Sequence, residues 1–213
     1  MRATLEVLAA LVLGYLCGSL PFGLWLGRLF KGVDVRTLGS GNLGATNVYR
    51  SLGPGIGVVT LLLDIAKGAV PVAFLPGTAL FASFPGGPQW CALAVGVGAV
   101  AGHVWTFLAS FHGGKGVATT AGVLLALSPP AFGVFVAVFL VTLLATRYVS
   151  VGSILAAVAF PIALARFEPG GMRSPGFALG VALAVLVVVR HRENIGRLAR
   201  GEERRFTFTR RKA

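Results

Sequence analysis

The amino-acid sequence predicts an all-α membrane protein, a polytopic bundle of about seven transmembrane helices that forms a single integral membrane domain over residues 1–213. Of the 213 residues, 55% are hydrophobic and only 12% are charged, which is about half the charged share of a typical soluble domain. The mean hydropathy is +0.82, and the apolar residues lie in runs long enough to cross a bilayer, roughly 20 residues each. The third observation is the placement of the basic residues, which orients the bundle.

The apolar runs place the spans at residues 5–29, 54–75, 90–111, 117–127, 131–146, 151–165 and 176–189. Pro21 is expected to kink the first run. We interpret this run as a retained span, because it continues to about Phe30 without an A-x-A-like cleavage site. The run at 117–127 is short for a full crossing and could instead be re-entrant. Glycine pairs with GxxxG spacing, such as those at 14/18 and 98/102, predict close helix packing.

The lysines and arginines predict that the N-terminus lies outside and the C-terminus lies in the cytoplasm. With seven spans, the inner side holds fifteen basic residues: Arg28, Lys31, Arg36, Arg50, Lys115, Arg147 and nine in the tail 190–213. The outer side keeps only Arg2, Arg166 and Arg173. This asymmetry accounts for the net charge of +12 without a nucleic-acid partner, and we expect none. The loops at about 31–53 and 111–117 and the basic tail then share the cytoplasmic face.

The first polar segment runs from Gly39 to Arg50, with the sequence GSGNLGATNVYR. Its G-x-G-x-x-G follows a membrane span instead of a strand, so we reject a dinucleotide fold. Its glycines, Gly41 among them, let backbone N–H groups approach an anion closely. Hydrogen-bonding side chains and a guanidinium suited to phosphate complete the segment: Ser40, Asn42, Thr46, Asn47 and Arg50. An ordinary interhelical loop with capping residues is the alternative.

The second polar segment is Phe111-His112-Gly113-Gly114-Lys115-Gly116, directly before the short apolar run. It is not a P-loop, because Ala109 and Gly116 stand where that motif needs Gly and Ser or Thr. Free N–H groups, a helix N-terminus and an ammonium still favour a bound phosphate. The alternative is a flexible turn with a positive-inside lysine.

Ionisable residues inside the spans are functional candidates. His103 lies in the third span, where a structural histidine bonded to a neighbouring helix is the alternative. Asp64 and Lys67 lie at i and i+3 in the second span and are predicted to form a structural ion pair, with catalysis by Asp64 as the alternative. No two histidines have a metal-ligand spacing such as H-E-x-x-H, so we expect no metal site.

Three segments in order, GSGNLGATNVYR, then GH…FHGGKGVAT, then HRENIGRL, resemble the bacterial acyl-phosphate:glycerol-3-phosphate acyltransferases. The resemblance covers about residues 14–201. The family commonly has a proline where this chain has Thr106. The resemblance implies a multi-pass enzyme of the bacterial inner membrane with its active site facing the cytoplasm. Such an enzyme acylates the 1-hydroxyl of glycerol 3-phosphate with acyl phosphate, without a cofactor, acyl-CoA or acyl carrier protein, and gives lysophosphatidic acid and phosphate in phospholipid biosynthesis.

The site expected from this resemblance binds two phosphates beside membrane lipid. Ser40, Asn47 and Arg50 would hold one phosphate, and Lys115 with the amides of Gly113, Gly114 and Gly116 the other. His103 is the candidate base, although a substrate phosphate could take the proton. His191 and Asn194 would close the site from the tail, where an amphipathic helix drawn to anionic lipid is the alternative. The expected catalytic residues are Ser40, His103, Lys115 and Asn194, and the expected binding residues are Gly41, Asn42, Thr46, Asn47, Arg50, Gly113, Gly114, Gly116 and His191.

Two other classes of function compete with this one. A transporter for an organic phosphate would also place glycines and cations near broken helices, but it commonly shows internal repeats and a site near the midplane. We see no internal repeat in this sequence. A non-enzymatic scaffold that binds anionic lipid is supported only by the basic tail.

Overall fold

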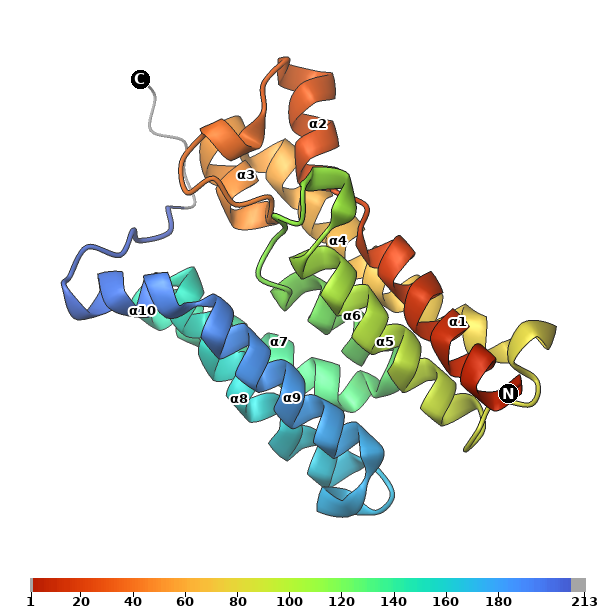
Figure 1. Ribbon diagram of the computed structural model, residues 1–213. Helices are drawn as coiled ribbons and strands as arrows, with labels where there is room; N and C mark the ends of the chain where they lie inside the picture. The colour runs from red at the N-terminus through yellow and green to blue at the C-terminus, as the bar shows by residue number, and fades with distance from the viewer. Residues whose placement is uncertain (1, 208–213) are drawn as a thin grey trace. The chain divides into compact units, whose positions relative to one another are not determined.

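The computed structural model describes residues 2–207, and the regular elements in this range are all helical (Figure 1). The chain forms two compact units, one up to Leu127 and one from Ser128 onward. The α-helices of the first unit are α1 (Arg2–Gly18), α2 (Phe22–Lys31), α3 (Ala45–Leu52), α4 (Pro54–Phe74), α5 (Pro88–Val104) and α6 (Val117–Leu127). Those of the second are α7 (Pro129–Thr146), α8 (Val149–Phe167), α9 (Pro175–Arg190) and α10 (Arg192–Ala199). A single domain across both units stays a prediction.

The prediction of a polytopic helical membrane protein is confirmed. Within the described residues, five stretches are long and apolar enough to span a bilayer: Arg2–Lys31, Pro54–Gly77, Pro88–Ala109, Pro129–Thr146 and Val149–Phe167. Helices α9 and α10, which bend by 54°, would make a sixth. The fourth predicted span is helix α6, whose eleven residues extend about 16 Å, roughly half of the 30 Å hydrocarbon core.

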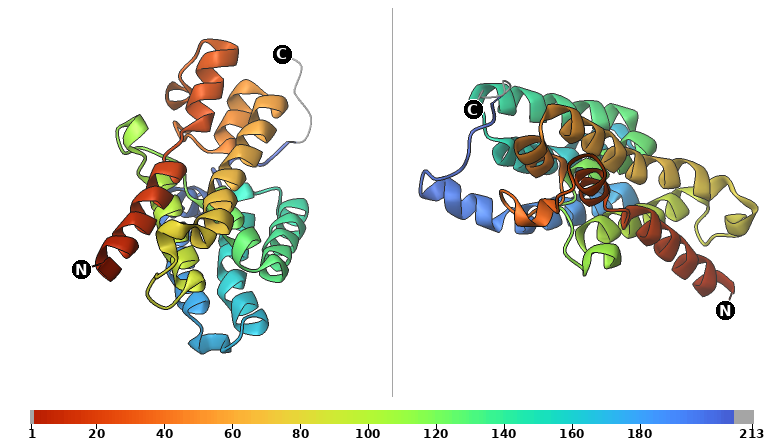
Figure 2. Two further views of the ribbon diagram at one scale, coloured as in Figure 1. Left: turned by 90° about the vertical axis from the view of Figure 1, so that its right-hand side faces the viewer. Right: turned by 90° about the horizontal axis from the view of Figure 1, so that it is seen from above.

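Helices α1 and α5 pack along each other through glycines, as the GxxxG spacing predicts (Figures 1 and 2). A Cβ atom added at any of four positions would collide with the backbone of the facing helix: Gly14, Gly18, Gly98 and Gly102. Glycine at these positions therefore lets the two backbones approach each other, which is how helices associate where lipid offers no hydrophobic driving force.

The first span is broken at Ser19–Pro21, between α1 and α2. Proline has no N–H to continue a helical ladder, so the kink predicted at Pro21 is confirmed as a full break. The freed carbonyls need partners, because unpaired backbone groups are costly in a membrane. The carbonyl of Leu20 accepts from Lys67 Nζ at 2.8 Å, and that of Ser19 accepts from the hydroxyl of Thr106.

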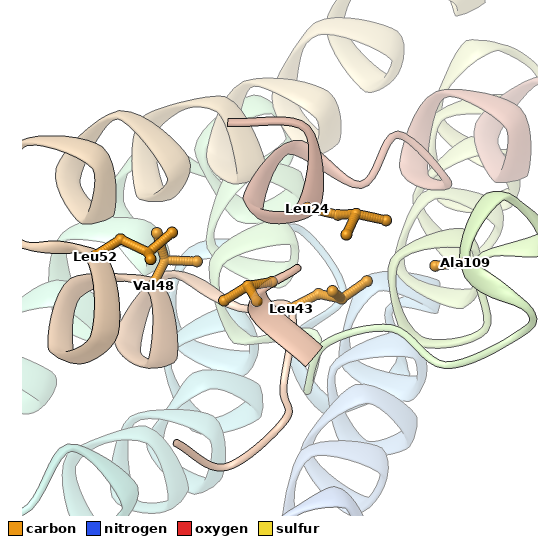
Figure 3. Packing of buried hydrophobic residues seen from close by; sticks show 6 residues of the cluster. Leu24, Leu43, Val48, Leu52 and Ala109 are labelled. Carbon is orange, nitrogen blue, oxygen red and sulfur yellow. The ribbon is translucent and has the colours of Figure 1, made fainter. Parts of the chain in front are cut away.

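A small core joins the two polar segments that the sequence singles out. The 3-10 turn η4 (Phe107–Ala109), in the connection between α5 and α6, contributes Ala109. The rest of the cluster comes from α2, the following loop and α3: Leu24, Val35, Leu43, Val48 and Leu52 (Figure 3). The segments at 39–50 and 112–116 therefore lie at the same end of the first unit, as the shared-face prediction requires. The expected loop at 31–53 contains a 3-10 turn, η1 (Val35–Thr37), and helix α3.

In the second unit, α8 packs against both α7 and α9. After α10 the chain turns back toward the start of α8. Phe206 N donates to Arg147 O at 2.6 Å, and Glu203 accepts from Ser150 Oγ at 2.8 Å. This return brings residues 203–206 of the basic tail against the α7–α8 connection and the start of α8.

Candidate active site

Asn47 organises the first polar segment from inside. Its side chain is 5% exposed, and its Nδ2 lies within hydrogen-bond distance of three carbonyls, those of Val35, Leu38 and Asn42 at 3.3, 3.0 and 2.9 Å. Its Oδ1 accepts from Ser40 N at 3.0 Å. Because an amide group has two N–H donors, Asn47 is fully used within the loop. We therefore revise its expected contact with phosphate and assign to it the shape of the loop.

Two other features hold this segment in shape. The carboxylate of Asp34 binds the side chains of Arg36 at 2.7 Å and Arg28 at 2.9 Å. The hydrogen bond from Arg36 is the main cause that holds the pKa of Asp34 well below its usual range. Asn42 Oδ1 accepts from Gly44 N at 2.8 Å, so this oxygen serves the turn that precedes α3. The sequence analysis missed Asp34, since nothing in the sequence alone separates it from an ordinary loop carboxylate.

Three polar side chains of this segment remain as candidates for a substrate. Ser40 and Arg50 are exposed, and Thr46, at the first turn of α3, is half-buried. Gly41 has φ +69°, a region that glycine adopts at little cost. These positions match a phosphate site at the rim of the loop.

Helix α5 ends earlier than the sequence predicts, at Val104 instead of 111. The chain turns back on itself here, and the amides of Gly113 and Gly114 donate to the carbonyls of Val104 and His103 at 3.1 and 3.0 Å. These glycines therefore close the C-terminal end of a helix, so their amides are used inside the protein and we revise their expected role as phosphate donors. Lys115, which is half-buried, and Gly116, with φ +86°, then lead into α6. Helix α6 begins directly after them, and a helix N-terminus is a place where anions commonly bind.

His103 is 5% exposed and lies in the last turn of α5. Its Nδ1 is 3.6 Å from Asp64 Oδ1, and a Cβ atom added at Gly114 would collide with its imidazole ring at Nε2. The imidazole thus packs between a carboxylate and the backbone of the glycine loop. This arrangement fits a structural role for His103 better than a role as general base, because a general base must reach the proton that it removes.

The predicted ion pair between Asp64 and Lys67 is present, with Lys67 Nζ 2.8 Å from Asp64 Oδ1. Both side chains are buried, and together with His103 they line a small pocket. The other residues that line this pocket come from the α1–α2 break, the first polar segment and the α5–α6 connection: Pro21, Phe22, Gly23, Leu43, Thr106 and Gly114.

His191 and Asn194 lie in the second unit, at the bend between α9 and α10. His191 Nδ1 is 2.7 Å from Val187 O, and Asn194 Nδ2 donates to Glu203 Oε1 at 2.6 Å. Both side chains are buried. Their approach to the first unit, and with it the catalytic role of Asn194, stays a prediction.

Glu203 is a residue that the sequence analysis missed. Its carboxylate accepts from Ser150, Asn194 and Arg197 at 2.8, 2.6 and 2.8 Å. Burial alone would raise the pKa of Glu203, but these three hydrogen bonds outweigh it and hold the pKa below its usual range. The basic tail also contains Glu193 and Glu202, so the sequence does not single out Glu203.

No cluster of three or more histidine, cysteine, aspartate or glutamate side chains in the described range 2–207 is arranged to hold a metal ion. The candidate substrate contacts of the first unit, Ser40, Thr46, Arg50 and Lys115, are hydroxyl groups and cations. Such a set suits phosphate.

Comparison with known proteins places the chain in a family. The family model for glycerol-3-phosphate acyltransferase matches residues 8–201. A glycerol-3-phosphate acyltransferase of Desulforudis audaxviator is 44% identical over 97% of this chain and 98% of its own length. A glycerol-3-phosphate acyltransferase of Geobacter sulfurreducens is 46% identical over 95% of this chain and 98% of its own length.

Solved structures agree. A crystal structure of an integral membrane glycerol 3-phosphate acyltransferase, in its glycerol 3-phosphate form, is 38% identical and covers 94% of this chain and 96% of its own, with a TM-score of 0.82. A second, in a lysophosphatidic acid form, is 37% identical with a TM-score of 0.80. The chain therefore belongs to the glycerol-3-phosphate acyltransferase family and is an integral membrane acyltransferase.

Proposed function

We propose that the chain transfers a fatty acyl group from acyl phosphate to the 1-hydroxyl of sn-glycerol 3-phosphate. The products are lysophosphatidic acid and inorganic phosphate, and the reaction serves phospholipid biosynthesis at the cytoplasmic face of the bacterial inner membrane. The observation that carries the proposal is the packing of two phosphate-suited segments, 39–50 and 113–116, at one end of the first unit. Leu43 and Ala109 share a core, and Leu43 and Gly114 line one pocket.

Two adjacent anion sites suit this reaction because both substrates carry phosphate. Ser40 and Arg50 bind one phosphate, and Lys115 with the start of α6 binds the other. Related solved structures with glycerol 3-phosphate and with lysophosphatidic acid support the acceptor and the product. The cations hold two negative substrates together, and such positioning can supply a large share of the rate acceleration.

The reaction exchanges one bond to the acyl carbon for another. The 1-hydroxyl oxygen attacks the acyl carbon, the bond from that carbon to the phosphate oxygen breaks, and phosphate leaves with the electron pair. The hydroxyl proton passes to a phosphate oxygen. The burial of His103 between Asp64 and Gly114 supports this acceptor over the histidine.

Purified protein in detergent, given acyl phosphate with and without glycerol 3-phosphate, tests the proposal. We expect phosphate release that depends on the acceptor, with 1-acyl-glycerol 3-phosphate identified by mass spectrometry. Turnover with acyl-CoA or acyl carrier protein and none with acyl phosphate would exclude the proposed donor. Uptake of glycerol 3-phosphate into vesicles without any turnover would favour a transporter instead.

Arg50→Ala and Lys115→Ala test the two phosphate contacts. Each should lower turnover at least tenfold, judging from losses of roughly 10²–10³ for a single oxyanion donor. Lys31→Ala, at the exposed end of α2, is the matched control and should leave turnover unchanged. Full activity of either site variant refutes the assignment. For the orientation, a reporter fused to the C-terminus should be active only in the cytoplasm.

A further inference from the structure

Three buried ionisable side chains in the membrane-embedded part of the first unit have no role in the proposed chemistry. Asp64, Lys67 and His103 are 2%, 7% and 5% exposed. Asp64 Oδ1 lies 2.8 Å from Lys67 Nζ and 3.6 Å from His103 Nδ1. Charged residues inside a membrane are costly and commonly serve a function. Apolar residues often replace a buried ion pair without loss of stability, so stability alone does not explain the pair.

Lys67 connects the pair to the α1–α2 break. Its Nζ donates to the carbonyl of Leu20 at 2.8 Å and lies 5.7 Å from the ring centre of Phe22, the first residue of α2. Helix α2 is followed by the turn η1 and then by the first polar segment, and its Leu24 belongs to the core that also contains Leu43 and Val48 of that segment. The position of the ammonium therefore bears on where the first polar segment begins.

His103 connects the pair to the glycine loop. Its backbone carbonyl accepts from Gly114 N at 3.0 Å, and its imidazole packs so closely on Gly114 that an added Cβ would meet three atoms of the ring. Asp64 faces the other side of the same ring. A carboxylate that orients a histidine, which in turn supports a backbone loop, is a typical supporting arrangement for a binding site.

We propose that Asp64, Lys67 and His103 act together as positioning residues that hold the Gly113–Gly116 loop and the α1–α2 break in the geometry that binds the two phosphates. This inference rests on the proposed function and adds the supporting residues of its site. None of the three touches the reacting atoms. Their effect passes through Lys115 and through the first polar segment.

The contact between His103 and Gly114 is tested by a double-mutant cycle that needs no activity. Gly114→Ala should lower the Tm of the purified protein in detergent, because its methyl group collides with the imidazole. In a His103→Ala background the same substitution should cost clearly less, since the colliding ring is gone. An equal loss in both backgrounds overturns the proposed support of the loop. The cycle remains decisive even if the protein proves not to transfer acyl groups.

The role of the ion pair is tested with the double variant Asp64→Leu/Lys67→Met, which removes both charges and leaves neither unpaired. We expect a Tm within a few degrees of the wild type and a KM at least tenfold higher for both phosphate substrates. Wild-type KM values for both substrates refute the proposal.

His103→Gln provides a second measurement if the double variant fails to fold. A glutamine amide can occupy part of the space between Asp64 and Gly114 and keeps a polar end. The KM of His103→Gln should therefore be closer to the wild-type value than the KM of His103→Ala. Equal KM values for the two histidine variants would count against positioning by the ring. A wild-type protein without acyl transfer refutes the proposed function alone, since the stability cycle still reports on the loop.

Discussion

Replacing Asn47 with alanine should loosen the first polar segment even when no substrate is bound. The two N–H groups of its amide can make two full hydrogen bonds to the surrounding carbonyls, and its oxygen accepts a third from Ser40 N. A typical hydrogen bond contributes roughly 0.5–1.5 kcal/mol net, and an unsatisfied buried carbonyl adds to the loss. Removing all three should destabilise the closed loop by about 2–4 kcal/mol.

Hydrogen exchange followed by mass spectrometry measures this loss directly. The peptide that contains Ser40 should lose protection by roughly 30- to 700-fold in substrate-free protein, since 1.4 kcal/mol is about a factor of ten. Asn42→Ala is the matched control, because it removes only the bond from Gly44 N and should cost about 1 kcal/mol. If hydrogen exchange of this peptide is unchanged in substrate-free Asn47→Ala and differs from the wild type only when phosphate is added, our reasoning is refuted. Asn47 would then be a phosphate ligand.

Three further outcomes follow from the contacts. Glu203→Gln should lower the Tm at pH 7; because the folded carboxyl has a lowered pKa, its stabilisation is present above the unfolded pKa and should be lost as pH falls through the folded pKa, so a pH-independent difference contradicts the assignment. Gly18→Ala should impair folding, measured by yield and Tm, whereas Gly55→Ala, which meets no atom within 4 Å, should not; equal behaviour argues against close α1–α5 packing. Thr106→Val removes the hydroxyl bond to Ser19 O and should cost about 1 kcal/mol, a Tm shift of roughly 2–4 °C; an unchanged Tm would show that this bond does not hold the break.

The structure also explains a departure from the family pattern. At the position where the resemblance found in the sequence leads us to expect proline, Thr106 is buried and donates to a carbonyl freed by the break in the first span. Helix α5 ends two residues before Thr106, at Val104, although the sequence predicted a span that continues to 111. What Thr106 does there depends on Ser19, 87 residues away.

The linear sequence determined the class, the break at Pro21, the α1–α5 glycine contact and the Asp64–Lys67 pair. Each of these features follows from local physics. The length of the apolar runs matches the thickness of a bilayer, and Pro21 lacks the N–H that a continuous helix needs. Glycines four residues apart lie on one helix face, and so do charges at i and i+3. Motif order was enough to identify the family.

Tertiary structure alone decided which of the polar residues are available to a substrate. Asn47, Gly113 and Gly114 look like phosphate donors in the sequence, yet their N–H groups are used by carbonyls of Val35, Leu38, Asn42, His103 and Val104. A hydrogen-bond donor serves a ligand only if the fold leaves it unused. That depends on which distant carbonyls the chain brings near it, and no local pattern records those distances.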